Sequence, residues 1–285
     1  MAPWISLQPQ PSARMAEPSQ VPPSWVGIIL LVLTFGSFIP QWYRIFKRRD
    51  CTGIPLISAV LNLVNFNEQF FMAFVLHDGV QDWISYAQLA LPCAYWLIIL
   101  IASLFMPSKG RLMISQGFSL YGLYVLLSVA SITVWCMLGD EGLSEAKILL
   151  SIVFLVRFCF LQPLLAVFGL GGAALAQASA IPAAGSSASS LSMTGLATQA
   201  VAFAIQAVFW FWRTGFPKSE RGFWAWYMIV GWLCVPSAVY AIAQMAVWVA
   251  AAKNRATVED LMVAPETEPL LSSQATNGEP LSESR

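Results

Sequence analysis

The sequence predicts an all-α polytopic membrane protein with seven transmembrane helices, in a 3+1+3 arrangement of two triple-helix repeats. Of its 285 residues, 58% are apolar and only 11% are charged, whereas about a quarter of a soluble domain is charged. Seven runs are also long and apolar enough to cross a hydrocarbon core of about 30 Å. Backbone groups in lipid need partners within their own segment, so helices are expected. The runs lie at 25–44, 55–76, 83–105, 112–137, 147–170, 194–212 and 223–251.

Composition and motifs argue against several other classes of protein. Lys plus Arg and Asp plus Glu both number 15, so no basic field exists to hold a nucleic acid. Five cysteines without a CxxC pair and the single His77 predict no metal site, disulfide framework or cofactor. No catalytic motif is present, so an enzyme is not expected. The expected partners are a small-molecule solute and the lipid bilayer, and the oligomeric state is left open.

Three polar or small-residue segments are expected to lie outside the helices. Residues 1–24 read as a disordered leader, and 253–285 as a disordered cytosolic tail, around a transmembrane domain at 25–252. Residues 171–192 are almost wholly Gly, Ala, Ser, Gln and Pro, which indicates a flexible loop or a frayed extension of the fifth helix.

Loop charges predict the orientation of the chain. Eight Lys and Arg residues fall after the first and third helices and beside the last one, against five on the opposite side. The positive-inside rule therefore places the C-terminus in the cytosol and the N-terminus outside or in a lumen. The basic run 44–49 is expected to set this topology, with binding of anionic lipid as a second use.

The first three helices and the last three show signs of a repeat. A shift of 137 positions places Asn62 on Gln199 and Gln69 on Gln206. The pairs Pro40-Gln41 and Gln162-Pro163 need a shift of about 123, so the segment 171–192 would hold an insertion of about 14 residues. A single linker helix between two triplets keeps them in the same orientation, which makes a parallel repeat.

These motifs resemble the PQ-loop repeat family, which includes SWEET sugar transporters, cystinosin and vacuolar amino-acid transporters. The resemblance spans about 25–252 and rests on Phe38-Ile39-Pro40-Gln41, Lys47-Arg48-Arg49 and Thr52-Gly53-Ile54. The stretches 67–70 and 82–88 look like a fungal branch of that family. The reversed pair Gln162-Pro163 departs from the family pattern.

The resemblance implies a membrane transporter of a small polar solute, either an amino acid or a sugar. The alternative is a member of the same fold that does not transport, namely a trafficking receptor or membrane scaffold. In a transporter of this family, Pro40 and Pro163 would act as hinges. Proline removes a backbone donor and bends a helix, and Gln41 could bond a carbonyl that is freed in this way. The simpler interpretation is a static kink.

Polar side chains predict a solute cavity. Amides in hydrocarbon need partners, so the faces that carry them are expected to look inward. Hydrogen bonding between helices is the alternative use of these groups. The candidate solute-binding residues are Asn62, Asn65 and Gln69 on the second helix, Gln199 and Gln206 on the sixth, and Tyr240 and Gln244 on the seventh.

Glu68 and Arg157 are the ionisable groups well inside the predicted spans. Burying an isolated charge there costs about 2.5 kcal/mol or more. We therefore expect mutual pairing, a neutral Glu68, or a water cavity. Glu68 is the candidate for proton coupling, and a structural pair with Arg157 is the competing interpretation.

The tail carries a candidate sorting signal. Glu266 precedes the pair Leu270-Leu271 by four residues, which fits the acidic dileucine form that cytosolic adaptors read. It predicts an integral membrane protein of vacuoles or lysosomes, with another endomembrane as the alternative.

Overall fold

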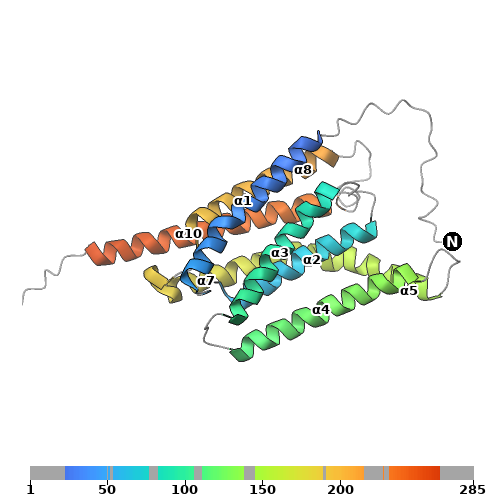
Figure 1. Ribbon diagram of the computed structural model, residues 1–285, viewed down its shortest axis with the longest axis horizontal. Helices are drawn as coiled ribbons and strands as arrows, with labels where there is room; N and C mark the ends of the chain where they lie inside the picture. Colours follow the sequence, from blue (N-terminus) through green and yellow to red (C-terminus); the bar gives the residue numbers. More distant parts are fainter. Residues whose placement is uncertain are drawn as a thin grey trace, which may run out of the picture.

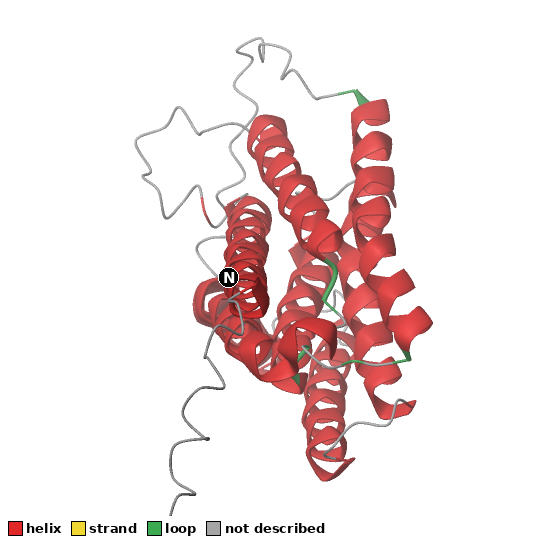
Figure 2. Cartoon of the chain, turned by 90° about the vertical axis from the view of Figure 1, so that its left-hand side faces the viewer, coloured by secondary structure: helices red, strands yellow, loops and turns green. Residues whose placement is uncertain are grey.

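The computed structural model describes residues 23–49, 51, 54–76, 83–105, 111–137, 145–188, 191–214, 227 and 231–263, and it is helical almost throughout these ranges (Figure 1). Figure 2 shows helices and a few loop residues, with no strand in the described parts of the chain. The α-helices are α1 (Ser24–Arg48), α2 (Leu56–Leu76), α3 (Trp83–Phe105), α4 (Arg111–Met137), α5 (Glu145–Val156), α6 (Gln162–Leu164), α7 (Leu170–Ala188), α8 (Met193–Thr214) and α10 (Trp232–Val263).

Two π-helical turns join α5, α6 and α7 into one helix from residue 145 to residue 188. They are η2 (Arg157–Leu161) and η3 (Leu165–Gly169). In each turn, the backbone N–H that follows it bonds the carbonyl five residues earlier, from Gln162 to Arg157 and from Leu170 to Leu165. Such wide turns are rare and often occur at functional sites.

The prediction of a flexible loop at 171–192 is wrong for residues 171–188, where the chain is helical. The small residues that suggested a loop let this helix pack closely against α2 and α10. Ala173, Gln177 and Ile181 are accordingly buried. Helix continuation, which was the alternative for this segment, describes it correctly.

The last helix also runs further than expected. α10 continues to Val263, so the prediction of a disordered tail from residue 253 is wrong for the first eleven residues of that segment. Its 32 residues span about 48 Å, which is longer than the hydrocarbon core. Figure 1 shows its C-terminal part projecting beyond the other helices.

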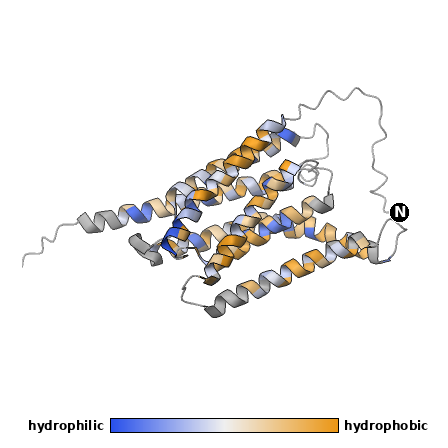
Figure 3. Ribbon diagram, in the orientation of Figure 1, coloured by the Kyte–Doolittle hydropathy of each residue, from blue (hydrophilic) through white to orange (hydrophobic). Residues whose placement is uncertain are grey.

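The structure supports an integral membrane protein. Five helices in the described ranges are long and apolar enough to span a membrane, and α4 adds a shorter apolar stretch at Tyr121–Ser131. α2 is not among the five, and Figure 3 shows hydrophilic residues within it. Seven spans in a 3+1+3 arrangement therefore stay a prediction. The five candidates are Ser24–Arg48, Trp83–Ser103, Ile148–Pro182, Met193–Arg213 and Trp232–Thr257.

The helices pack as two groups of three. α3 packs against both α1 and α2, while α10 packs against both α8 and α7. The groups meet where α1 lies along α8 and where α2 lies along α7. α4 packs mainly on α2. Large apolar side chains are exposed around the outside, as a lipid-facing surface requires; they include Val32, Leu126, Phe168 and Ile242.

Candidate functional site

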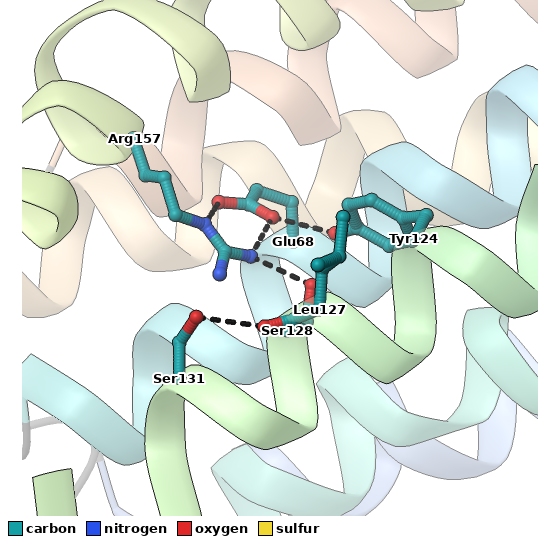
Figure 4. Close-up of polar contacts among 6 residues, drawn as sticks. All are labelled: Glu68, Tyr124, Leu127, Ser128, Ser131 and Arg157. Carbon is teal, nitrogen blue, oxygen red and sulfur yellow. Dashed lines mark hydrogen bonds and ion pairs between the residues drawn. The ribbon is translucent and has the colours of Figure 1, made fainter. Parts of the chain in front are cut away.

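An ion pair is buried where α2, α4 and the first π-helical turn meet. Nε and one terminal nitrogen of Arg157 donate to the two carboxylate oxygens of Glu68, at 2.9 and 2.5 Å. The hydroxyl of Tyr124 donates to the same carboxylate at 2.5 Å, and Arg157 also donates to Ser128 at 3.0 Å. Figure 4 shows these side chains converging from the three elements.

This geometry selects mutual pairing from the three arrangements expected for the buried charges. Glu68 is fully buried and the side chain of Arg157 is 12% exposed. A planar guanidinium that bonds both carboxylate oxygens is the strongest form of such a pair. Oε1 of Glu68 accepts one of these hydrogen bonds and Oε2 accepts two, so Arg157 and Tyr124 together hold the carboxylate in place.

The polar face of α2 points into the protein as predicted. Asn62, Asn65 and Gln69 are each at most 2% exposed. Asn62 donates to the Ser58 carbonyl of its own helix at 2.8 Å. In contrast, Nδ2 of Asn65 and Nε2 of Gln69 are buried without a hydrogen-bond partner in the described part of the chain. These two amide nitrogens remain available as donors.

The polar residues of α8 and α10 are buried as well. Gln199 joins two tyrosines: its amide oxygen accepts from Tyr240 at 3.1 Å, and its amide nitrogen donates to Tyr95 at 3.4 Å. Gln206 is 2% exposed, and its amide oxygen is another buried atom without a partner among the described residues. Gln244 is also buried.

Aromatic rings connect these polar faces at the centre of the bundle. Phe66 of α2 lies 5.8 Å from Phe203 of α8 and 5.1 Å from Tyr240 of α10, centroid to centroid. Phe38 of α1 stacks on Tyr95 at 3.9 Å. Of the predicted solute-binding residues, Tyr240 belongs to this aromatic centre and Gln199 bonds to it, while Asn65, Gln69 and Gln206 each keep a buried amide atom without a partner among the described residues.

The Pro40-Gln41 pair lies where α1 meets the start of α8. The amide oxygen of Gln41 accepts from the backbone N–H of Ser192 at 2.8 Å. The Ser192 hydroxyl in turn accepts from the N–H of Gly195 at 3.1 Å, which caps α8. Pro40 lies inside a continuous α1. Gln41 therefore ties the helix beside its proline to the opposite group of helices.

Replacing Gly195 by Ala is expected to destabilise the protein by about 1–3 kcal/mol, because the added carbon overpacks this junction. That carbon would lie 3.2 Å from Cβ of Ser192 and 3.3 Å from the backbone nitrogen of Gln41. The helix backbone cannot yield as a flexible side chain would. The melting temperature of purified protein measures the effect.

The matched control is Gly36→Ala in α1, where nothing lies within 4 Å of an added carbon. Ala favours a helix by about 1 kcal/mol over Gly, so this variant should be as stable as the wild type or more stable. Equal melting temperatures for Gly195→Ala and Gly36→Ala would contradict a close junction at Gly195.

The second predicted hinge lies between the two π-helical turns. Pro163 is inside the short α6, and the helix continues through it. Gln162 is fully buried, donates to the Trp232 carbonyl at 3.1 Å and accepts from the hydroxyl of Tyr227. It thus connects the long helix to the start of α10, which is a different connection from the one made by Gln41.

The sequence interpretation missed several residues of this centre. Tyr124 and Ser128 bind the ion pair, and Tyr121 accepts a hydrogen bond from Asn67. Their steps of three and four residues along α4 were a readable signal for one face turned to α2. Among the described residues, no three His, Cys, Asp or Glu side chains group as metal ligands would. Glu266, Leu270 and Leu271 lie outside the described residues.

The apolar helices and their buried polar centre define an integral membrane protein with a polar interior. A family model described as the PQ loop repeat matches residues 23–66, which include Pro40, Gln41 and about half of α2. This match supports the PQ-loop family, as the sequence motifs predicted. Searches of curated proteins and of solved structures returned no match.

Proposed function

We propose that the protein is a membrane transporter of a small polar solute, which binds between two triple-helix repeats. The observation that carries the proposal is the group of buried amide atoms without partners on Asn65, Gln69 and Gln206. Each such atom costs about 1–3 kcal/mol when it is left unsatisfied. Hydroxyl, amide or ammonium groups of a bound solute would satisfy them.

The helix packing supports a 3+1+3 arrangement. In each group the third helix lies between the first and second, since α3 contacts α1 and α2 just as α10 contacts α7 and α8. Contacts between the groups also correspond, because α1 with α8 matches α7 with α2. Phe66 and Phe203 differ by 137 positions, which is the shift that aligns Asn62 with Gln199. Their ring centroids lie 5.8 Å apart, as expected for equivalent residues beside a pseudo-twofold axis.

The continuous helix at 145–188 indicates a different equivalent of the Pro40-Gln41 pair in the second repeat. Gln41 precedes Ile54 by 13 residues, and Gln177 precedes Leu191 by 14. Ile54 and Leu191 align under the 137 shift, so Gln177 corresponds to Gln41 without a long insertion. Gln177 is also buried, at 3% exposed. We infer that Ala176-Gln177, rather than Gln162-Pro163, is the second copy of the motif.

Flux into sealed vesicles tests the proposal. Purified protein is reconstituted into vesicles. The vesicles are loaded with one amino acid or sugar of a panel at a time, and flux is measured with and without a proton gradient. We expect saturable exchange of one solute class, above the rate of protein-free vesicles. Absence of exchange for every solute, from protein that remains folded, would overturn transport and leave the receptor or scaffold alternative.

Two finer points belong to the same proposal. Glu68 would serve as the coupling acid, taking up a proton when its pair with Arg157 opens. The protein would reside in a vacuolar or lysosomal membrane if the signal at Glu266, Leu270 and Leu271 is read by cytosolic adaptors. The flux assay with a proton gradient addresses the first point, and localisation of a Leu270→Ala/Leu271→Ala variant addresses the second.

A further inference from the structure

Cations from two distant parts of the chain gather at one end of the bundle, where α1 and α10 leave their apolar stretches. The charges of Arg48 and Arg255 both act on Arg44. Arg44 and Arg48 are four residues apart on α1, so they share a face. Other basic residues that adjoin these three along the two helices are Lys47, Arg49 and Lys253.

Part of the Arg44 guanidinium is buried without a partner among the described residues. Its Nε is buried and has no hydrogen-bond partner in the described ranges. Like charges four residues apart on a helix repel each other, and Arg255 adds a third charge from the other helix. The neighbouring acids in the sequence, Asp50, Glu259 and Asp260, have side chains outside the described set.

The position and the chemistry of this cluster indicate what the anion is. A planar guanidinium matches the oxygens of a phosphate group, which it can bind with two parallel hydrogen bonds. Tyr43 is 63% exposed on the neighbouring turn, and Lys47 lies over its ring at 5.3 Å. Tyrosines in membrane proteins concentrate at the level of the lipid headgroups. A phosphate bound at Arg44 would therefore sit at headgroup depth.

We propose that Arg44, Arg48 and Arg255 form a site for the phosphate group of an anionic lipid headgroup. The site joins the end of α1 to the end of the apolar stretch of α10, so a bound lipid ties the two groups of helices together. This interaction is independent of solute transport.

The test measures the melting temperature of the full-length protein in detergent against three probes. These are a short-chain phosphatidylinositol phosphate, a short-chain phosphatidylcholine and the soluble inositol phosphate headgroup. We expect a saturable rise in melting temperature with the phosphoinositide alone. If the soluble headgroup bound as tightly as the phosphoinositide, the site would bind free phosphate compounds, and the proposal of a lipid ligand would be overturned. Equal shifts with phosphatidylcholine would overturn the site itself.

Variants show whether the named residues bind the phosphate. Arg44→Gln and Arg255→Gln should each weaken phosphoinositide binding about five-fold, which corresponds to about 1 kcal/mol per cation. Lys147→Gln removes a charge in the first turn of α5 and should leave binding unchanged. Since Arg255 is exposed on α10, its variant is expected to fold even if Arg44→Gln does not. Wild-type binding by Arg255→Gln would overturn the site.

Discussion

Replacing Glu68 by Gln is expected to lower the free energy of unfolding by about 3–5 kcal/mol, because Arg157 would keep a buried charge without a counter-charge. Arg157→Gln should have a similar effect, since it leaves the fully buried Glu68 carboxylate unpaired. The melting temperature of purified protein reports both losses. Tyr124→Phe removes one donor but keeps the ion pair, so it should cost only about 1 kcal/mol.

The double variant Glu68→Gln/Arg157→Gln distinguishes the energy of the ion pair itself from the energy of the other contacts of the two side chains. It carries no charge at the site of the pair, so it should recover much of the stability that each single variant loses. A double-mutant cycle measures this coupling. If the two losses simply added, the bidentate contacts at 2.9 and 2.5 Å would not stabilise the fold.

The same Glu68→Gln variant tests the proposed coupling role. In the flux assay it should abolish the response to a pH gradient while solute exchange at equilibrium continues, because Gln keeps the shape of the side chain but does not titrate. A folded Glu68→Gln protein with full pH-driven flux would leave Glu68 a structural partner of Arg157.

Replacing Gln206 by Leu is expected to weaken solute binding about 5- to 150-fold, equivalent to about 1–3 kcal/mol, while it raises the melting temperature. The amide oxygen of Gln206 is buried without a partner in the described part of the protein. A leucine of similar size removes that penalty in the empty protein, but it also removes the group offered to the solute. Stability and activity should thus change in opposite directions.

Gln162→Leu is the matched control for this prediction. Gln162 is equally buried, but both ends of its amide are bonded, to the Trp232 carbonyl and the Tyr227 hydroxyl. Its loss should lower the melting temperature by leaving both partners unsatisfied. If Gln206→Leu behaved like Gln162→Leu and left solute affinity unchanged, Gln206 would not bind the solute.

Much of the polar centre could be predicted from the sequence because lipid leaves few choices. Amides within an apolar run must face other protein, and the burial of Asn62, Asn65 and Gln69 confirms this. With Glu68 and Arg157 as the charges deep in the predicted spans, their pairing was one of three arrangements that the sequence allowed. Tyr124 was missed, although its spacing from Tyr121 and Ser128 along α4 indicates one face that turns toward α2.

The errors arose where packing outweighs local preference. Gly and Ser have weak helix propensity, so 171–192 suggested a loop. Contacts of α7 with α2 and α10 decide its conformation instead. Gln177, the proposed counterpart of Gln41, lies in the segment that was assigned to this loop. The residues after Ala252 are polar, so they suggested a disordered tail. In the structure, α10 instead continues as a helix beyond its apolar stretch.

The two wide turns of the long helix determine which way its halves face. The buried residues Phe154, Phe158, Gln162, Ala166 and Leu170 follow one another in steps of four. In a regular α-helix each such step overshoots a full turn by about 40°, and four steps would wind the row by about 160°. The turns at Arg157 and Leu165 take up that excess and keep the row in line. Tightening one of them to a regular turn would rotate the helix beyond it by about 80°, half of that excess. The two wide turns thus set the orientation of the half that Glu68 anchors relative to the half that holds Gln177.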